Sequence, residues 1–207
     1  MKAPSSAQLG FDALLAEAET VNREQEAAKA SAHLPATMAD ALPYFRGLLD
    51  RHHAAMIAAD IESALALRIE ARDLALKLNG GQNGILAGED APGCVLARET
   101  AAATGTVPLW GQRGDFTIDC NGMRVRVAMD GIFGIGATTG FWLGFAAFAV
   151  DRSRPFLSET GYRSFLGCWI DLAPDVTPDA FAATVIRHYV AHDLKGRLKT
   201  IVARPAG

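Results

Sequence analysis

The chain has 207 residues, of which half are hydrophobic and a fifth are charged, as in ordinary globular proteins and unlike disordered ones. A chain of this length suits one domain, or a compact domain with a helical annex, and can bury a core without disulfides or metals. The net charge of −3 argues against a dedicated nucleic-acid-binding protein, which usually carries a strongly basic surface.

Residues 1–34 are predicted to form a peripheral N-terminal helix. Apolar side chains recur there at helical spacing between residues 6 and 30, namely Phe11, Leu14, Leu15, Ala18 and Val21. The segment from His33 to Pro35 then breaks the pattern.

Residues 35–80 are predicted to form two antiparallel helices that turn near Ala59. Asp40 is the expected N-cap of the first helix and Asp60 that of the second. Asn79, followed by two glycines, is expected to end the second helix. The alternative, one helix of about 38 residues, would be long for an ordinary domain. One face of the first helix is apolar apart from its histidine: Phe45, Leu48, Leu49, His52 and Met56.

Residues 81–207 are predicted to form an α+β domain. Its first part, 81–110, is punctuated by glycines and predicts an ordered loop with a short helix near residues 94–103. The pair Asn121-Gly122, flanked by alternating residues, then predicts a β-hairpin of strands 116–120 and 123–129. Arg124 and Arg126 share one face of the second strand with Ala128, and the other face is apolar.

The rest of this domain is expected to add strands and one helix. Residues 141–150 predict a strand that is either central in the sheet or buried on both faces, and residues 168–172 and 198–203 predict two more. A helix is expected from Pro178 to about Leu194, because proline suits the first helical position. The fold class is therefore α+β, an antiparallel sheet with a packed C-terminal helix and an N-terminal helical annex.

A membrane span is the alternative to a buried core for Ile132–Val150, which has 19 residues and no charge. The stretch is rich in glycine and threonine, so its hydrophobicity is borderline for a bilayer. We favour a protein that is not embedded in a membrane. Three cysteines without metal-ligand or disulfide spacing, and an N-terminus without a signal peptide, favour the cytoplasm.

Neither a catalytic motif nor a cofactor motif is present, so whether the chain is an enzyme stays open. His188 and His192 are spaced to face the same way on the last helix and could bind a metal if a third ligand approached. His52 and His53 of the helical annex could supply that ligand if they approach in space. A pair at a helix C-terminus more often serves the helix dipole, so no metal site is predicted.

The segment 155–165 is the strongest candidate for a binding site. It follows the least polar stretch of the chain and is dense in hydrogen-bonding side chains, and loops held by a rigid scaffold often carry function. Tyrosine and arginine are also enriched at binding hot spots. The predicted binding residues of this loop are Ser158, Glu159, Thr160, Tyr162 and Arg163.

Arginine is also concentrated in the second half of the chain. Residues 101–207 hold eleven basic residues, nine of them arginine, against nine acidic ones, whereas residues 1–100 hold nine basic against fourteen acidic. Arg124 and Arg126 could form part of an anion-binding face, although a solvated sheet face is the simpler interpretation. The opposite charges of the two halves could also drive homo-oligomer formation.

Several runs together resemble a family of uncharacterised proteins that are encoded on proteobacterial plasmids and integrative elements. The resemblance covers roughly residues 40–204 and implies an accessory protein of a mobile genetic element, with no assigned activity. The runs are Leu76–Gly81, Gly84–Gly88, Asp90–Gly93, Val107–Gln112 and Pro155–Gly167.

Two functions follow from these observations. The favoured one is a non-enzymatic accessory protein that binds a macromolecular partner, a protein or less readily nucleic acid, through the Tyr162-Arg163 segment. The alternative is a small enzyme or ligand-binding domain for an anionic substrate at residues 155–165. In that case Arg163 would bind the anion, and Glu159 or His188 would move protons.

Overall fold

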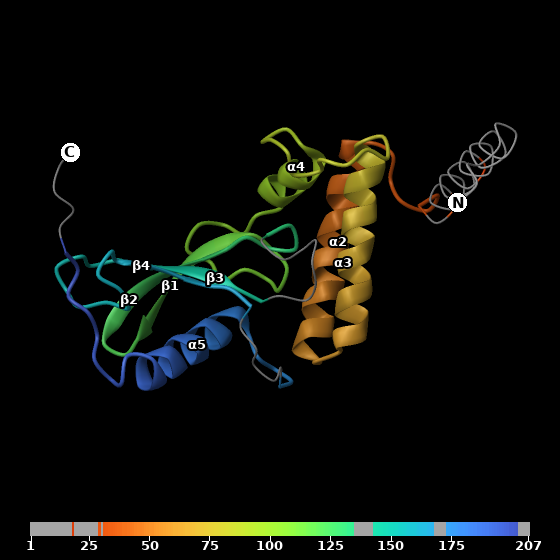
Figure 1. Cartoon of the computed structure of the whole chain (residues 1–207). Coiled ribbons are helices and arrows are strands. Elements are labelled where there is room, and N and C mark those ends of the chain that lie inside the picture. The colour runs from red at the N-terminus through yellow and green to blue at the C-terminus, as the bar shows by residue number, and fades with distance from the viewer. Residues whose placement is uncertain (1–17, 19–28, 30, 135–142, 168–172, 203–207) are drawn as a thin grey trace, which may run out of the picture.

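The computed structural model describes residues 18, 29, 31–134, 143–167 and 173–202. It confirms an α+β fold in which helices pack against one antiparallel sheet (Figure 1). The predicted N-terminal helix lies outside these residues, except that Ala18 and Lys29 are helical. The division of the chain at residues 34 and 80 stays a prediction.

The predicted helical hairpin is confirmed as α2, Met38–Ile57, and α3, Ile61–Leu78. Ala59 turns the chain with a φ of 56°, and the Asp60 carboxylate caps α3 by accepting the backbone N–H of Ser63 at 3.0 Å. The prediction that Asp40 caps α2 is wrong. Thr37 is the cap, because its hydroxyl oxygen accepts the N–H of Asp40 while it donates to the Asp40 carboxylate.

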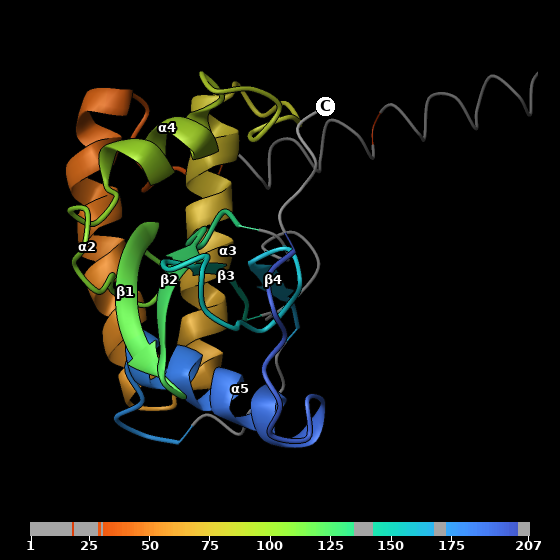
Figure 2. The ribbon, with the colours of Figure 1, turned by 90° about the vertical axis from the view of Figure 1, so that its left-hand side faces the viewer.

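A short helix, α4, spans Pro92–Glu99 within the glycine-rich segment. Leu96 and Ile85 of this region are buried in the same cluster as Phe45 and Leu74 of the hairpin, together with Phe133 from beyond the second strand. Figure 2 shows α4 beside one end of the hairpin and α5 near the other end. The glycine-rich segment thus covers the hairpin rather than forming a free linker.

The sheet contains four strands in the sequential order β1-β2-β3-β4, with every neighbouring pair antiparallel. Its strands are β1, Gly114–Cys120; β2, Met123–Met129; β3, Phe145–Ala149; and β4, Tyr162–Phe165. The predicted β1–β2 hairpin is confirmed, since Asn121 and Gly122 both have positive φ, 51° and 73°, as a two-residue hairpin turn requires.

β3 is central in the sheet, between β2 and β4, which confirms one of the two alternatives for this strand. Two expectations for the sheet need correction. Residues 162–165 form a strand rather than a loop. The strand expected at 198–203 is reduced, in the part that is described, to a single bridge between Phe156 and Lys199. The strand expected at 168–172 lies outside the described residues.

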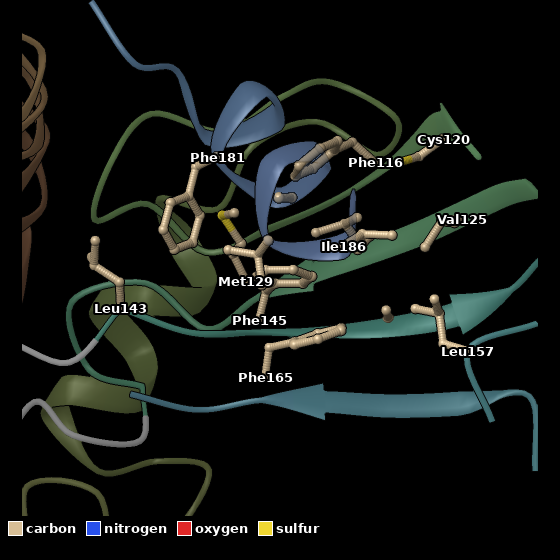
Figure 3. Close-up of a cluster of buried hydrophobic side chains, with 14 of the residues drawn as sticks. Phe116, Cys120, Val125, Met129, Leu143, Phe145, Leu157, Phe165, Phe181 and Ile186 are labelled. Atoms are coloured by element: carbon tan, nitrogen blue, oxygen red, sulfur yellow. The ribbon is translucent and has the colours of Figure 1, made fainter. Parts of the chain in front are cut away.

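Helix α5, Pro178–His192, begins at the predicted proline and covers the apolar face of the sheet. The side chains of Phe116, Phe145 and Phe165 point from three strands toward Phe181 and Ile186 of the helix (Figure 3). Phe145 stacks on Phe165 and meets Phe181 edge to face, with ring centroids 4.9 and 6.0 Å apart. Burial of large aromatic rings supplies much of a core's stabilisation, so this layer fixes the orientation of the sheet.

Trp110 connects the hairpin, the sheet and the segment that leads into α5. Its carbonyl oxygen is 2.9 Å from Nδ1 of His52, and its backbone N–H donates to Nδ1 of His53 at 3.1 Å. Its indole N–H donates to the carbonyl of Val176 at 2.7 Å. Two adjacent histidines of α2 therefore hold the backbone of one residue, one at its N–H and the other at its carbonyl oxygen.

Candidate binding surface

The face of the sheet opposite α5 gathers the polar and charged residues of the strands. Because side chains alternate along a strand, the residues between the buried ones share this face. The pairing register then aligns Thr117, Arg126, Phe148 and Tyr162 across β1, β2, β3 and β4. We call these four residues and Arg124 the open face.

Arg126, Phe148 and Tyr162 form a continuous stack along this row. The Arg126 guanidinium lies 4.1 Å from the centroid of the Phe148 ring, a cation–π contact. The Phe148 and Tyr162 rings are 5.1 Å apart between centroids and tilted by 50°. Tyr162 keeps 46% of its surface exposed, so the stack ends in an accessible aromatic ring.

Acidic residues of β1 balance the arginines of the open face. Arg126 forms an ion pair and hydrogen bond with Asp115, and Arg124 is registered opposite Asp119. The charge of Arg126 is therefore partly neutralised, and the anion-binding role expected for Arg124 and Arg126 stays a prediction. A surface with paired charges around aromatic rings is instead typical of protein interfaces, where Tyr and Arg are enriched.

The loop before β4 is held by its own hydroxyl groups. The Ser158 hydroxyl donates to the carbonyl of Tyr162 at 2.6 Å and accepts the Tyr162 N–H at 3.2 Å, and Thr160 makes similar contacts. Glu159 uses its carbonyl oxygen to accept the N–H of Val202. Ser158 and Thr160 thus stabilise the turn at the rim of the open face, as short polar side chains often do.

Arg163 lies on the other side of the sheet from Arg124 and Arg126. Its guanidinium is 4.5 Å from the ring centroid of Tyr189 on α5 and 5.9 Å from that of Phe165. The seven predicted binding residues therefore divide into three groups: Tyr162, Arg124 and Arg126 on the open face, Arg163 beside α5, and Ser158, Glu159 and Thr160 in the loop. Their role in binding stays a prediction.

A hollow of about 100 Å³ adjoins the exposed end of the stack. Tyr162 and Ser164 of β4 line it together with Ala146 of β3 and Asp130 beyond β2. It has room for a few atoms of a partner's side chain. Neither the hollow nor the place of Phe148 in the stack could be predicted from the sequence, because both depend on the register between β2, β3 and β4.

His188 and His192 lie one turn apart with their ring centroids 4.2 Å from each other, and both are exposed. Within the described residues no group of three or more His, Cys, Asp or Glu side chains could hold a metal. His52 and His53 instead contact the backbone of Trp110 through their Nδ1 atoms.

The described helices include none that is long and apolar enough to cross a bilayer. Residues 145–149 of the stretch considered as a membrane span form β3.

Comparisons with known proteins find similarity over part of the chain. No family model matches it, and no solved structure matches it closely. Two Escherichia coli proteins, each named protein KlcB, are 47% and 45% identical to it over 89 residues, which is 42% of this chain. The match spans only 18% and 21% of those two relatives, about a fifth of their length. This similarity fits a plasmid-associated accessory protein and assigns no activity.

Proposed function

We propose that the chain is a plasmid-associated accessory protein that binds a protein partner through the open face of its sheet. The observation that carries the proposal is the row of Arg126, Phe148 and Tyr162, which presents an exposed aromatic ring beside a hollow. A rigid sheet holds the three side chains in register, so little conformational entropy is lost when they are covered.

The charge of the open face favours a protein over nucleic acid. Arg126 forms an ion pair with Asp115 of β1, and Arg124 lies opposite Asp119 in the strand register, whereas affinity for nucleic acid comes mainly from cations that contact the phosphate backbone. Single-stranded nucleic acid also stacks on exposed aromatic rings, so it is the alternative that the experiment must separate.

The test compares wild type with a double variant, Arg126→Ala with Tyr162→Ala, which removes both ends of the stack. Arg187→Ala, an exposed arginine on α5, is the matched control. Each protein is tagged, captured from plasmid-bearing cells under native conditions, and its associated proteins are quantified by mass spectrometry. We expect a partner that the wild type and Arg187→Ala retain and that the double variant loses at least tenfold, since hot-spot truncation costs about 2 kcal/mol or more.

Purified protein is then titrated with the recovered partner and, separately, with labelled single-stranded and duplex DNA. Loss of partner binding in the folded double variant supports the proposal. Equal partner recovery by all three proteins contradicts it. If wild type and Arg187→Ala bind DNA in a salt-sensitive manner and the double variant does not, the partner is nucleic acid rather than a protein.

A further inference from the structure

Helix α3 carries an exposed apolar stripe. Ile61, Leu65 and Ile69 recur four residues apart, so they are neighbours along one side of the helix, and they are 36%, 37% and 59% exposed. The buried residues of α3 lie on a different side, which packs against the rest of the fold: Ala64, Leu67, Ala71, Leu74 and Ala75. An apolar surface that stays exposed beside a well-packed one often marks an interaction site.

Two charged residues extend this stripe at its ends. Glu62 lies three residues before Leu65, and Arg72 lies three residues after Ile69, which is the alternation of three and four that aligns side chains along a helix–helix seam. Both charged side chains are exposed, and neither takes part in an ion pair among the described residues. We call Glu62, Leu65, Ile69 and Arg72 the α3 seam.

The α3 seam is complementary to itself when two copies of the helix run antiparallel. With a twofold axis at the level of Leu67, Leu65 of each copy faces Ile69 of the other, and Glu62 of each faces Arg72 of the other. The seam then has two apolar layers in the middle and a pair of opposite charges at either end.

The charges also exclude the other direction of packing. In a parallel pair each residue of the seam would face its own equivalent, so that Glu62 would meet Glu62 and Arg72 would meet Arg72. Like charges placed against each other are costly at an interface. The order of charges along α3 therefore favours the antiparallel arrangement.

We propose that the α3 seam is a homodimer interface in which two copies of α3 pack antiparallel. One pair of helices covers a small area, and interfaces below about 1,200 Å² are typically weak and transient. The dimer should therefore form reversibly as the protein concentration rises. It does not depend on the partner proposed for the open face, because no residue of the seam belongs to the sheet.

The test is sedimentation equilibrium of the full chain over a wide range of concentrations. We expect a reversible equilibrium between monomer and dimer in wild type. Ile69→Glu should weaken the dimer about tenfold or more, since it places an unpaired charge in an apolar layer. The matched control is Val202→Glu, because Val202 is similarly exposed, at 62%, and lies outside α3. This control should dimerise as wild type does.

A charge exchange tests the register. Glu62→Arg and Arg72→Glu, each alone, should weaken the dimer about tenfold or more, because each creates like-charge pairs across the seam. The variant with both substitutions should dimerise again, since it restores opposite charges at both ends. Damage to α3 itself would instead accumulate in the double variant. An equimolar mixture of the two single variants should form a heterodimer for the same reason.

Wild type that stays monomeric at every concentration would overturn the proposal, and this result requires no variant that must fold. A dimer that withstands Ile69→Glu and both single charge substitutions would also overturn it, because another surface would then join the copies. If the charge exchange fails to restore a dimer although circular dichroism shows the double variant to be folded, the antiparallel register is wrong.

Discussion

Acid should destabilise this protein through His52. The pKa of this imidazole is about 4 in the folded chain, against 6.5 for an unperturbed histidine. Between these values the unfolded state binds a proton that the folded state does not, so the free energy of unfolding falls as the pH is lowered. From pH about 7.5 to pH about 4.5 the two pKa values give a loss of about 2.5 kcal/mol from this residue alone.

The assay is urea unfolding followed by circular dichroism at both pH values, with wild type and His52→Asn. His52→Asn should be less stable than wild type at neutral pH by about 2 kcal/mol, because the smaller asparagine side chain leaves part of the space of the buried imidazole empty. Its further loss on acidification should be smaller than that of wild type by about 2.5 kcal/mol. Carboxylates with lowered pKa, such as Glu70 and Asp60, add the same acid sensitivity to both proteins and cancel in the difference. Equal losses in the two proteins would refute the assignment of a buried neutral imidazole.

Two further changes test how the hairpin is held. Gly111→Ala should lower the free energy of unfolding by at least about 2 kcal/mol more than Gly105→Ala does. Both glycines have positive φ, but a Cβ at Gly111 would meet His52, whereas nothing lies within 4 Å of the Cβ position at Gly105. Equal losses for the two variants in denaturant unfolding would show that the contact with the ring is unimportant. Glu70→Gln should lower the free energy of unfolding by about 1–2 kcal/mol near neutral pH, since the Glu70 carboxylate accepts the Tyr44 hydroxyl at 2.6 Å. Although burial raises the pKa of Glu70, such hydrogen bonds outweigh it and hold the pKa below the ordinary value. The difference in stability between wild type and variant should therefore shrink as the pH falls toward that pKa, and a difference that persists in acid would contradict the prediction.

The local elements of the fold could be predicted from the sequence because their signals are local. Asp60 and Asn121-Gly122 define a helix start and a hairpin turn through their own backbone preferences, and both predictions are confirmed. Thr37 was missed as the cap of α2 because Asp40, three residues later, carries an equally good signal. β4 was missed because Ser158–Phe165 contains no alternation strong enough to separate a turn from a short edge strand.

The candidate surface could be predicted only in part. Arg124, Arg126 and Tyr162 were selected by residue type, but nothing in the sequence shows that Phe148 lies between them, since that depends on two inter-strand registers. Arg163 neighbours Tyr162 in sequence and lies on the opposite face, because successive residues of a strand alternate. His52 was expected on the apolar face of α2. Its hydrogen bond to Trp110 could not be predicted, because it joins residues 58 positions apart and leaves no local pattern in the sequence.

The three-way attachment of Trp110 gives the protein an intrinsic optical reporter. Trp110 is 4% exposed. Its indole N–H donates to the carbonyl of Val176, and its ring meets that of Phe181 edge to face with centroids 5.3 Å apart. The backbone N–H and carbonyl of Trp110 are held by the two histidines of α2. Separation of the hairpin, the sheet or α5 would change the polarity around this indole and so its emission wavelength. With Trp142 and Trp169, the other two tryptophans of the chain, replaced by phenylalanine, the fluorescence of Trp110 would follow assembly of all three parts at once.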